Sequence, residues 1–383
     1  MLPTFTNGFW TPKMLAWLLG GSSLVALQWT LPTRARPRPP GSWWLAALFA
    51  WVSLQFIGSN VWPWLWLHET ADRFPYHWSI SMIIPSLTFF LSVLVWRALV
   101  QATDSPQRWV RLGVQVCAYA TVIAVYGLVQ QVGLDPLIWV FQGAPGSLGT
   151  HVAITVFGNP MLTANCLAIC APLCLVFKPR WCRLSYGLML LCLLCMGKSR
   201  STMSLFAFLL GSSVIWVYRR QWHWLLGAWG AALAGVGWLA LTHQLSSFLS
   251  FSGRWAMWST VLTVWTKQPW YAWMGYYLGA VESATANRLW NYGSLHCEPL
   301  QILFELGVVG FVLSAGAVWQ FLTRIVKAPK DTLLMGWLGS ALSYALIACT
   351  SFPFRVGTLL MLGVLIVAAL ESLMEDTAHA YPA

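Results

Sequence analysis

The sequence predicts an all-α, polytopic membrane protein with about 11 transmembrane helices (10–12) and a short external helical loop region. Hydrophobic residues make up 58% of the 383 residues and charged residues only 9%, whereas soluble domains contain about 25% charged residues. Apolar stretches near the length that crosses a bilayer, about 20 residues, recur along the chain. We therefore expect a single integral membrane domain over residues 1–383, with no short cleavable signal peptide before a soluble remainder.

Each predicted span is a mostly apolar window that is bounded by polar or turn-forming residues. In order, the windows are 14–31, 42–60, 78–96, 109–130, 161–177, 184–197, 201–218, 222–242, 299–321, 332–350 and 356–373. The windows 161–177 and 184–197 are short for a span, so the sequence defines their edges less well than those of the others.

The basic residues predict the orientation of these spans, because loops on the cytoplasmic side carry an excess of Lys and Arg. Alternate loops divide the basic residues 14 against 8. The larger set comprises Arg34, Arg36, Arg38, Arg97, Arg108, Arg111, Lys178, Arg180, Arg183, Arg219, Arg220, Arg324, Lys327 and Lys330. We place this set inside, with the N-terminus outside and the C-terminus inside. The net charge of +11 is then a topology signal, and we expect no nucleic-acid partner.

This orientation puts the two longest hydrophilic segments, 131–160 and 243–298, outside the membrane. Functional residues gather on loops that a rigid scaffold holds, so we expect an external site carried mainly by 243–298. Trp255, Trp258 and Trp265 in "RWAMWSTVLTVWTK" are typical of a helix that lies in the membrane interface. Pro269 is expected to end that helix, and the sequence "QPWYAWMGYYLG" is expected to form a tight aromatic connection.

The nine cysteines show no metal-ligand spacing, and most of them fall in apolar runs. Cys166, Cys170 and Cys174 recur every four residues, which places them on one helical face. We expect buried, reduced side chains that pack as small hydrophobes, and no metal site.

Three external segments combine polar side chains with proximity to the membrane. They are "MGKSRSTMS" with Lys198 and Arg200, "SFSGRWAMW" with Arg254 at the expected start of the interfacial helix, and "LHCEP" with His296 before Pro299. Taken singly, each has a structural explanation. An interfacial arginine usually extends its charged group to lipid headgroups, and a single interfacial histidine is usually a hydrogen-bonded structural residue.

Two acidic residues follow His296. Glu298 and Glu305 are seven residues apart, so they lie on one helical face about 10 Å apart at 1.5 Å per residue. Negative charge is favourable at a helix start, which accounts for Glu298. Glu305 lies further into the apolar run, and we expect it to have a specific partner. Gly307 and Gly310 would let another helix approach closely.

Taken together, the three segments suit chemistry on a diphosphate. Two guanidinium groups offer permanently charged planar donors for phosphate oxygens, and a histidine can accept the proton of an attacking hydroxyl. A diphosphate-linked lipid brings its own leaving group, so glycan transfer at such a site needs neither nucleotide nor ATP. Electrostatic stabilisation of the departing diphosphate would be the largest contribution.

The ordered motifs resemble the O-antigen ligase and polymerase superfamily of glycan transferases over about residues 125 to 356. The motifs are "YGLVQQVGLDP", "VFGNPMLTAN", "GKSRS", "SGRWAMW" followed by "QPWYAWMG", "LHCEPLQILFELGVVG" and "SFPFR". The resemblance implies an undecaprenyl-diphosphate-linked glycan as donor and a GT-C-like, inverting transfer without metal or cofactor.

The resemblance also implies residue roles. Arg200 and Arg254 would hold the diphosphate, and His296 would be the base or would position the acceptor hydroxyl. Glu305 occupies a recurrent acidic position, for which we favour a structural or His-orienting role. The residues expected to contact substrate are Arg200, Arg254, Lys198, Asn159, Glu298 and Glu305. The chain differs from the family pattern at Cys297, where Asn is usual, and at Met161, which replaces a polar residue.

The expected function is ligation of a glycan to an acceptor hydroxyl on the external face of the cytoplasmic (inner) membrane of a bacterium. The acceptor would be a lipid core or a glycan, and membrane lipids would surround the site. Repeat-unit polymerisation and protein O-glycosylation are the alternatives within the same chemistry. A polysaccharide or lipid transporter is the alternative from another class, although such proteins often carry internal repeats and ionisable residues deep within spans.

Overall fold

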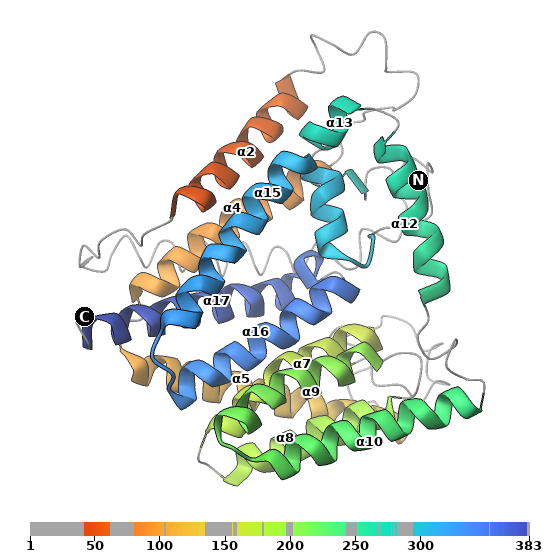
Figure 1. Cartoon of the computed structure of the whole chain (residues 1–383), viewed down its shortest axis with the longest axis vertical. Coiled ribbons are helices and arrows are strands. Elements are labelled where there is room, and N and C mark those ends of the chain that lie inside the picture. Colours follow the sequence, from red (N-terminus) through yellow and green to blue (C-terminus); the bar gives the residue numbers. More distant parts are fainter. Residues whose placement is uncertain are drawn as a thin grey trace. The chain divides into compact units, whose positions relative to one another are not determined.

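The described part of the chain is helical. The computed structural model describes residues 42–61, 80–102, 105–134, 155, 159–177, 180–196, 202–242, 251–266, 269–276, 278, 280–281, 294–351 and 353–380. These residues form α-helices and short 3₁₀ turns and contain no strand, which confirms the predicted all-α class for this part of the chain (Figure 1).

Every predicted span except 14–31, which lies outside the described residues, coincides with a helix. The helices are α2 (Ser42–Val61), α4 (Ile80–Ala102), α5 (Pro106–Gln131), α7 (Pro160–Val176), α8 (Arg180–Cys195), α9 (Thr202–Tyr218), α10 (Trp222–Leu241), α15 (Glu298–Lys327), α16 (Thr332–Thr350) and α17 (Gly357–Ala380). Three of them, α5, α15 and α16, are long and apolar enough to cross a membrane, and several others contain shorter apolar stretches. The chain is a multi-pass membrane protein, and the total of 11 spans stays a prediction.

The chain divides into two compact units. Unit 1 contains α2, α4, most of α12 (Phe251–Thr266), α13 (Pro269–Met274), α15 and the start of α17. Unit 2 contains α5, α7, α8, α9, α10, α16 and the end of α17.

In unit 1, α2 lies along α15 and also packs against α4. Leu48 and Val52 of α2 are buried against Leu306 of α15, and Phe49 of α2 packs edge-on against Phe90 of α4, with ring centroids 4.8 Å apart. Apolar burial and aromatic geometry therefore both hold α2 in place.

Helix α15 bends sharply at Gly307 (Figure 1). Gly307 has φ 69° and ψ −175°, a conformation that is essentially restricted to glycine. A first arm, residues 298–306, therefore precedes a second arm, residues 308–327. The predicted window 299–321 assumed one continuous helix, and the structure corrects this. The sequence signal for the break was "ELGVVG", where Gly307 interrupts an apolar helical pattern.

The backbone groups that the bend exposes are satisfied by neighbouring elements. The Phe304 carbonyl accepts a hydrogen bond from Tyr276 N at 3.1 Å, and the Leu306 carbonyl accepts one from Trp51 Nε1 of α2 at 3.0 Å. Gly275, which also has a positive φ of 80°, lies against Gly307 so closely that no Cβ would fit at either position. The predicted close approach is confirmed: Gly307 lies against Trp273 of α13 and Gly275 after it, and Gly310 lies against Trp51 of α2.

The sequence between α12 and α15 departs from the expectation in two ways. Helix α12 begins at Phe251, so Arg254 lies at the end of its first turn and does not open it. The aromatic connection after Pro269 is partly helical, because residues Pro269–Met274 form α13.

In unit 2, helices α7, α9 and α16 form the tightest packing. Gly211 of α9 and Gly339 of α16 touch through their backbones, and Pro172 of α7 lies against both glycines. Trp109 of α5 and Trp337 of α16 are buried edge to face, with ring centroids 6.0 Å apart. Small residues at such contacts let helices approach closely where lipid removes the usual hydrophobic driving force.

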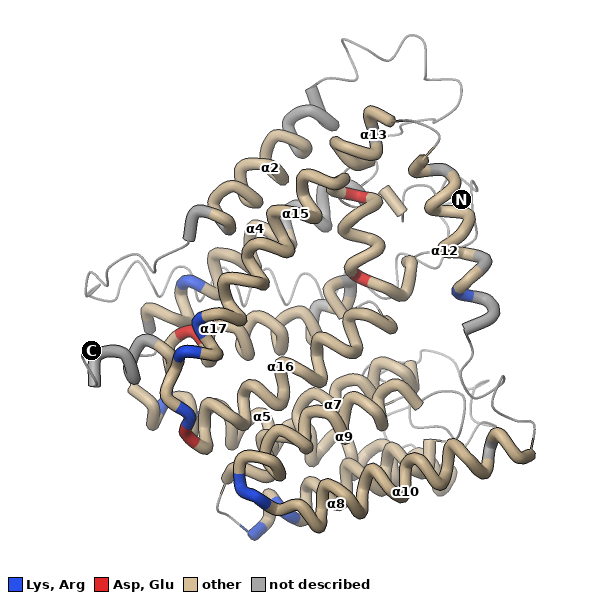
Figure 2. Tube along the Cα trace, in the orientation of Figure 1, with Lys and Arg blue, Asp and Glu red and all other residues tan. Residues whose placement is uncertain are grey.

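Most cysteines behave as predicted. The described cysteines are all free, and six of them are buried. The buried ones are Cys117, Cys166, Cys170, Cys174, Cys182 and Cys192. Lys and Arg residues lie mainly towards helix ends, with Arg324 and Lys327 in the last turn of α15 (Figure 2). This distribution agrees with the charge pattern on which the predicted orientation rests.

Candidate active site

Arg254 and His296 come together in unit 1. Arg254 lies in the first turn of α12 and His296 in the short segment, residues 294–297, that precedes α15. Both side chains are half-buried. They are close enough for the Arg254 charge to lower the pKa of His296. Two of the three residues that the sequence predicted to act on substrate therefore lie near each other, and their action on substrate stays a prediction.

His296 has an unusual backbone. Its φ of 50° lies in the left-handed region, which few residues other than glycine adopt. Cys297 then returns to an extended conformation and occupies the N-cap of α15, and Pro299 lies in the first turn as predicted. Strained backbone of this kind persists only where the surroundings hold it, and it clusters at functional sites.

The surroundings of His296 hold the preceding residue, Leu295, from both sides. The Leu295 N–H donates to Gln301 Oε1 at 3.2 Å, and the Leu295 carbonyl accepts from Trp258 Nε1 of α12 at 2.7 Å. We call Gln301, Trp258 and the Leu295 backbone the Leu295 clamp. Through it, α12 and α15 both fix the chain one residue before His296.

Glu305 orients the clamp. Its side chain is fully buried in the first arm of α15. Its Oε1 accepts a hydrogen bond from Gln301 Nε2 at 3.1 Å and a longer one from Val281 N at 3.5 Å. The predicted specific partner of Glu305 is therefore Gln301. Because the Gln301 amide gives its N–H to Glu305, its oxygen faces Leu295.

Glu298 has a second structural role besides its place in the first turn of α15. It is only 2% exposed, and its Oε1 accepts a hydrogen bond from Phe354 N at 3.0 Å. Phe354 belongs to the "SFPFR" motif, so this bond joins two of the motifs that the sequence singled out.

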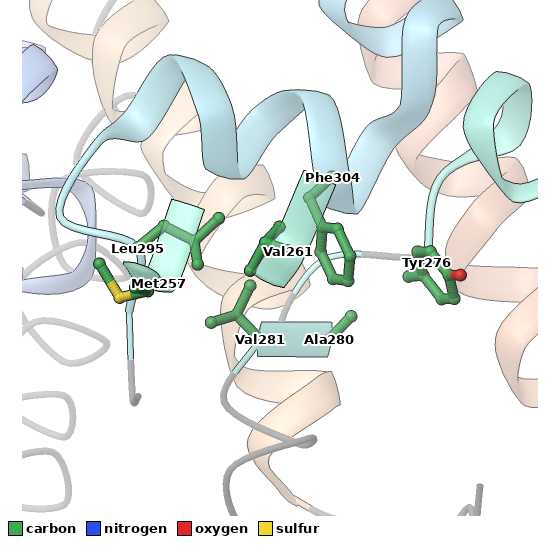
Figure 3. Close-up of a cluster of buried hydrophobic side chains, with 7 residues drawn as sticks. All are labelled: Met257, Val261, Tyr276, Ala280, Val281, Leu295 and Phe304. Atoms are coloured by element: carbon green, nitrogen blue, oxygen red, sulfur yellow. The ribbon is translucent and has the colours of Figure 1, made fainter. Parts of the chain in front are cut away.

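An apolar cluster supports the same segment (Figure 3). It comprises Met257, Val261, Tyr276, Ala280, Val281, Leu295 and Phe304. Within it, Tyr276 and Phe304 stack with ring centroids 4.7 Å apart. Trp258 and Trp265 pack against this cluster, while Trp255 is 71% exposed. Trp258 and Trp265 therefore contribute to this packing, and the interfacial position of the helix stays a prediction.

Burial and the nearby cation keep His296 neutral. Burial of the imidazole is the larger cause and the Arg254 charge the smaller, and together they lower the pKa of His296 to about 4. Burial also lowers the pKa of Arg254, whose ordinary value is far above neutrality. At neutral pH the site therefore pairs a cation with a neutral imidazole that can accept a proton.

Of the other predicted site residues, Lys198 and Arg200 lie outside the described residues, and Asn159 belongs to unit 2. Asn159 is the N-cap of α7, and its Oδ1 accepts from Met161 N at 2.8 Å. This bond gives Asn159 a structural explanation, because asparagine is favoured at helix N-caps.

Asn165, six residues after Asn159, links three quoted motifs within unit 2. Its Nδ2 donates to Ser351 Oγ of "SFPFR" at 3.1 Å, and its Oδ1 accepts from Ser204 Oγ of "MGKSRSTMS" at 2.8 Å. We call Asn165, Ser204 and Ser351 the Asn165 junction.

Sequence reasoning missed Gln301, Trp258 and Asn165 as partners of these motifs. The available signals were a glutamine four residues before Glu305, a spacing at which helical side chains meet, and an asparagine inside an apolar span. Among the described residues, no group of three or more His, Cys, Asp or Glu side chains could hold a metal ion.

Comparison with known proteins finds a family model that is similar to part of the chain. The family model described as O-antigen ligase matches residues 185–315, which confirms the resemblance that the motifs indicated. The matched segment includes Arg254, His296, Glu298 and Glu305 and excludes Asn159. No curated protein matches the chain.

Proposed function

Because residues 185–315 match the O-antigen ligase model, we propose that the chain transfers a glycan from an undecaprenyl-diphosphate-linked donor to an acceptor hydroxyl. The observation that carries this proposal is the half-buried His296, which lies directly before α15 and close to the cationic Arg254 of α12. The reaction would take place on the external face of the bacterial inner membrane, and the acceptor would be a lipid core.

Arg254 would bind the diphosphate. Its guanidinium is half-buried, so its attraction for a phosphate oxygen is screened less than it would be in bulk water. The substrate roles expected for Arg200 and Lys198 from the family resemblance stay predictions. Electrostatic stabilisation of the leaving group is the term from which such a site gains most.

His296 would accept the proton of the acceptor hydroxyl. The hydroxyl oxygen attacks the anomeric carbon on the face opposite the diphosphate and forms the new glycosidic bond. The bond from that carbon to the diphosphate oxygen breaks, and undecaprenyl diphosphate leaves with the electron pair. The hydroxyl proton passes to His296, and one displacement of this kind inverts the anomeric configuration.

The low pKa of His296 fits this order of events. In the free protein the Arg254 charge disfavours the imidazolium. A bound diphosphate would offset that charge and raise the pKa of His296, which would make the imidazole a better base when the donor is present. Base strength would then depend on donor binding.

An in vitro reaction tests the proposal. Purified protein in lipid nanodiscs would receive a diphosphate-lipid glycan together with a lipid-core acceptor or a repeat-unit acceptor, each in a separate reaction. We expect transfer to the lipid core and release of undecaprenyl diphosphate. Transfer to the repeat unit alone would make the protein a polymerase. Absence of transfer with either acceptor, with donor binding intact, would contradict the proposed function.

The matched control is His296→Ala in the same nanodiscs. This variant removes the proposed base and keeps Arg254. It should bind the donor and transfer no glycan above background, whereas an unrelated contaminating activity would persist in it.

A further inference from the structure

We propose that Gln301 and Trp258 are positioning residues that set the reactive orientation of His296 through the backbone of Leu295, with Glu305 fixing the orientation of Gln301. This inference rests on the proposed function, because it explains how His296 is held in the orientation that the proposed proton transfer requires. It concerns residues that do not touch the reacting atoms.

The first step is the backbone of His296. A φ of 50° is unfavourable for a residue with a Cβ, so the peptide groups around it must be held. The preceding residue has both of its backbone polar groups bonded to side chains, at 3.2 Å to Gln301 Oε1 and at 2.7 Å to Trp258 Nε1. The conformation of His296 is therefore tied to two helices.

The second step is the orientation of Gln301. A glutamine amide can present either its oxygen or its NH₂ group to a neighbour. The buried carboxylate of Glu305 accepts from Gln301 Nε2 at 3.1 Å, and this leaves Gln301 Oε1 to face the Leu295 N–H. A buried, hydrogen-bonded carboxylate is well suited to select one of the two amide orientations.

The third step is the support from α12. Trp258 packs against the apolar cluster while its N–H reaches the Leu295 carbonyl. Leu295 itself is fully buried in that cluster, beside Met257 (Figure 3). Since Arg254 lies one helical turn before Trp258 on α12, the same helix carries both the proposed phosphate ligand and one side of the clamp.

Trp258→Phe tests the clamp with a matched control on the same helix. The substitution keeps an aromatic ring and removes the donor to Leu295. Trp265→Phe makes the same change at a residue that packs on the same cluster, but Trp265 Nε1 finds no hydrogen-bond partner among the described residues. We expect Trp258→Phe to lower kcat about tenfold with donor KM within about twofold, and Trp265→Phe to leave both unchanged.

Reversal of the Glu305–Gln301 pair tests the second step. Gln301→Glu alone faces two buried carboxylates towards each other, so kcat should fall by about 100-fold. Adding Glu305→Gln restores one carboxylate and one amide in the opposite order, with an acceptor still available for the Leu295 N–H. We expect the double variant to recover to within about fivefold of the unsubstituted protein.

A readout on His296 itself separates positioning from general stability. The ¹³C-histidine NMR signal of His296, identified by its loss in His296→Ala, should shift in Trp258→Phe and Gln301→Glu, and should return in the double variant. Equal losses in Trp258→Phe and Trp265→Phe, an unshifted His296 signal, or no recovery in the double variant would each overturn the inference. Full transfer by His296→Ala would instead overturn the proposed function.

Discussion

The buried polar side chains of the two units hold different parts of the chain. In unit 1 the buried polar groups include the carboxylates of Glu298 and Glu305, and their hydrogen bonds hold loop backbone. In unit 2, where Glu371 is also buried, several buried hydrogen bonds join neutral hydroxyl and amide groups. Examples are the Asn165 junction and the 2.7 Å bond from Ser343 of α16 to the Ala207 carbonyl of α9. Neutral bonds in unit 2 thus tie helix to helix. In unit 1, Glu298 holds the backbone of Phe354, and Glu305 acts through Gln301 on the segment that carries His296.

The bend at Gly307 explains how unit 1 accommodates the carboxyl groups of Glu298 and Glu305 in an apolar helix. Both carboxylates lie in the first arm of α15, and the second arm, residues 308–327, contains no acidic residue. At 1.5 Å per residue the second arm is about 30 Å long, enough for the hydrocarbon core of a bilayer. Glu305 therefore does not need to lie within the membrane-spanning part of the helix. The free-energy cost of placing its carboxyl group in hydrocarbon is avoided.

The largest effect is expected at the site in unit 1. His296→Ala and Arg254→Ala should each lower transfer by at least about 100-fold, as loss of a general base or of charge stabilisation does. Arg254→Lys should also be impaired, because an ammonium group cannot reproduce a two-pronged guanidinium contact. The measurement is surface glycan in a strain that lacks the native gene, with protein amount in the membrane as control. Normal glycan in both alanine variants would contradict the proposed roles.

The next largest effect concerns the bend. Gly307→Ala should cost about 3 kcal/mol or more in stability, because alanine is strained at this φ and its Cβ would collide with the Trp273 carbonyl. Thermal unfolding in detergent measures the loss. The control is Gly235→Ala in α10, where a Cβ meets nothing within 4 Å. It should stabilise slightly or have no effect. Equal stability of the two variants would show that the bend is dispensable.

The charge of His296 offers a pH test. With its pKa lowered to about 4, against about 6.5 in an unfolded chain, His296 binds fewer protons when folded. Its contribution to stability is present above pH 6.5 and is lost as the pH falls towards 4. NMR titration of His296 should give a midpoint near 4. In Arg254→Met the midpoint should rise and stay below 6.5, since burial persists. A midpoint of 6.5 in the unsubstituted protein would contradict a half-buried imidazole that is neutral at pH 7.

The smallest effect is expected at the Asn165 junction. Asn165→Leu should cost about 1–2 kcal/mol of stability, since hydrogen bonds between membrane helices contribute about 0.6 kcal/mol each on average and the freed hydroxyls lose a partner. Transfer per folded molecule should stay within about twofold. This would contrast with Gln301→Glu, which should lose activity at similar protein levels. A loss of activity without a loss of stability in Asn165→Leu would contradict the purely structural role assigned to the Asn165 junction.

The sequence predicted the helices well because apolar windows of about 20 residues, together with polar ends, define spans without knowledge of packing. It also predicted Glu305's need for a partner, since a carboxylate in an apolar run is costly. It did not predict the bend in α15 or the inward packing of Trp258 and Trp265. Those features depend on contacts between segments far apart in the chain, such as Trp51 with Leu306, and tryptophan occurs both in cores and at membrane interfaces.

The site was predicted residue by residue only where a motif carried chemistry. Arg254 and His296 were proposed in this way, and they lie close enough in unit 1 for their charges to interact, while their roles stay predictions. The role of Gln301 was not predicted, because a single glutamine in "LHCEPLQILFELGVVG" forms no distinctive motif. Its role depends on the positive φ of His296, which the sequence around a histidine does not reveal.

The most direct test of the account is a single-turnover measurement that separates donor binding from transfer. Purified protein in nanodiscs would be mixed with excess diphosphate-lipid glycan and a lipid-core acceptor, and both donor affinity and transfer rate would be measured. We predict that His296→Ala keeps donor affinity within about threefold and loses transfer by at least about 100-fold, while Arg254→Ala loses donor affinity as well. Unchanged single-turnover transfer in His296→Ala would contradict the central claim that neutral His296 beside Arg254 accepts the acceptor proton.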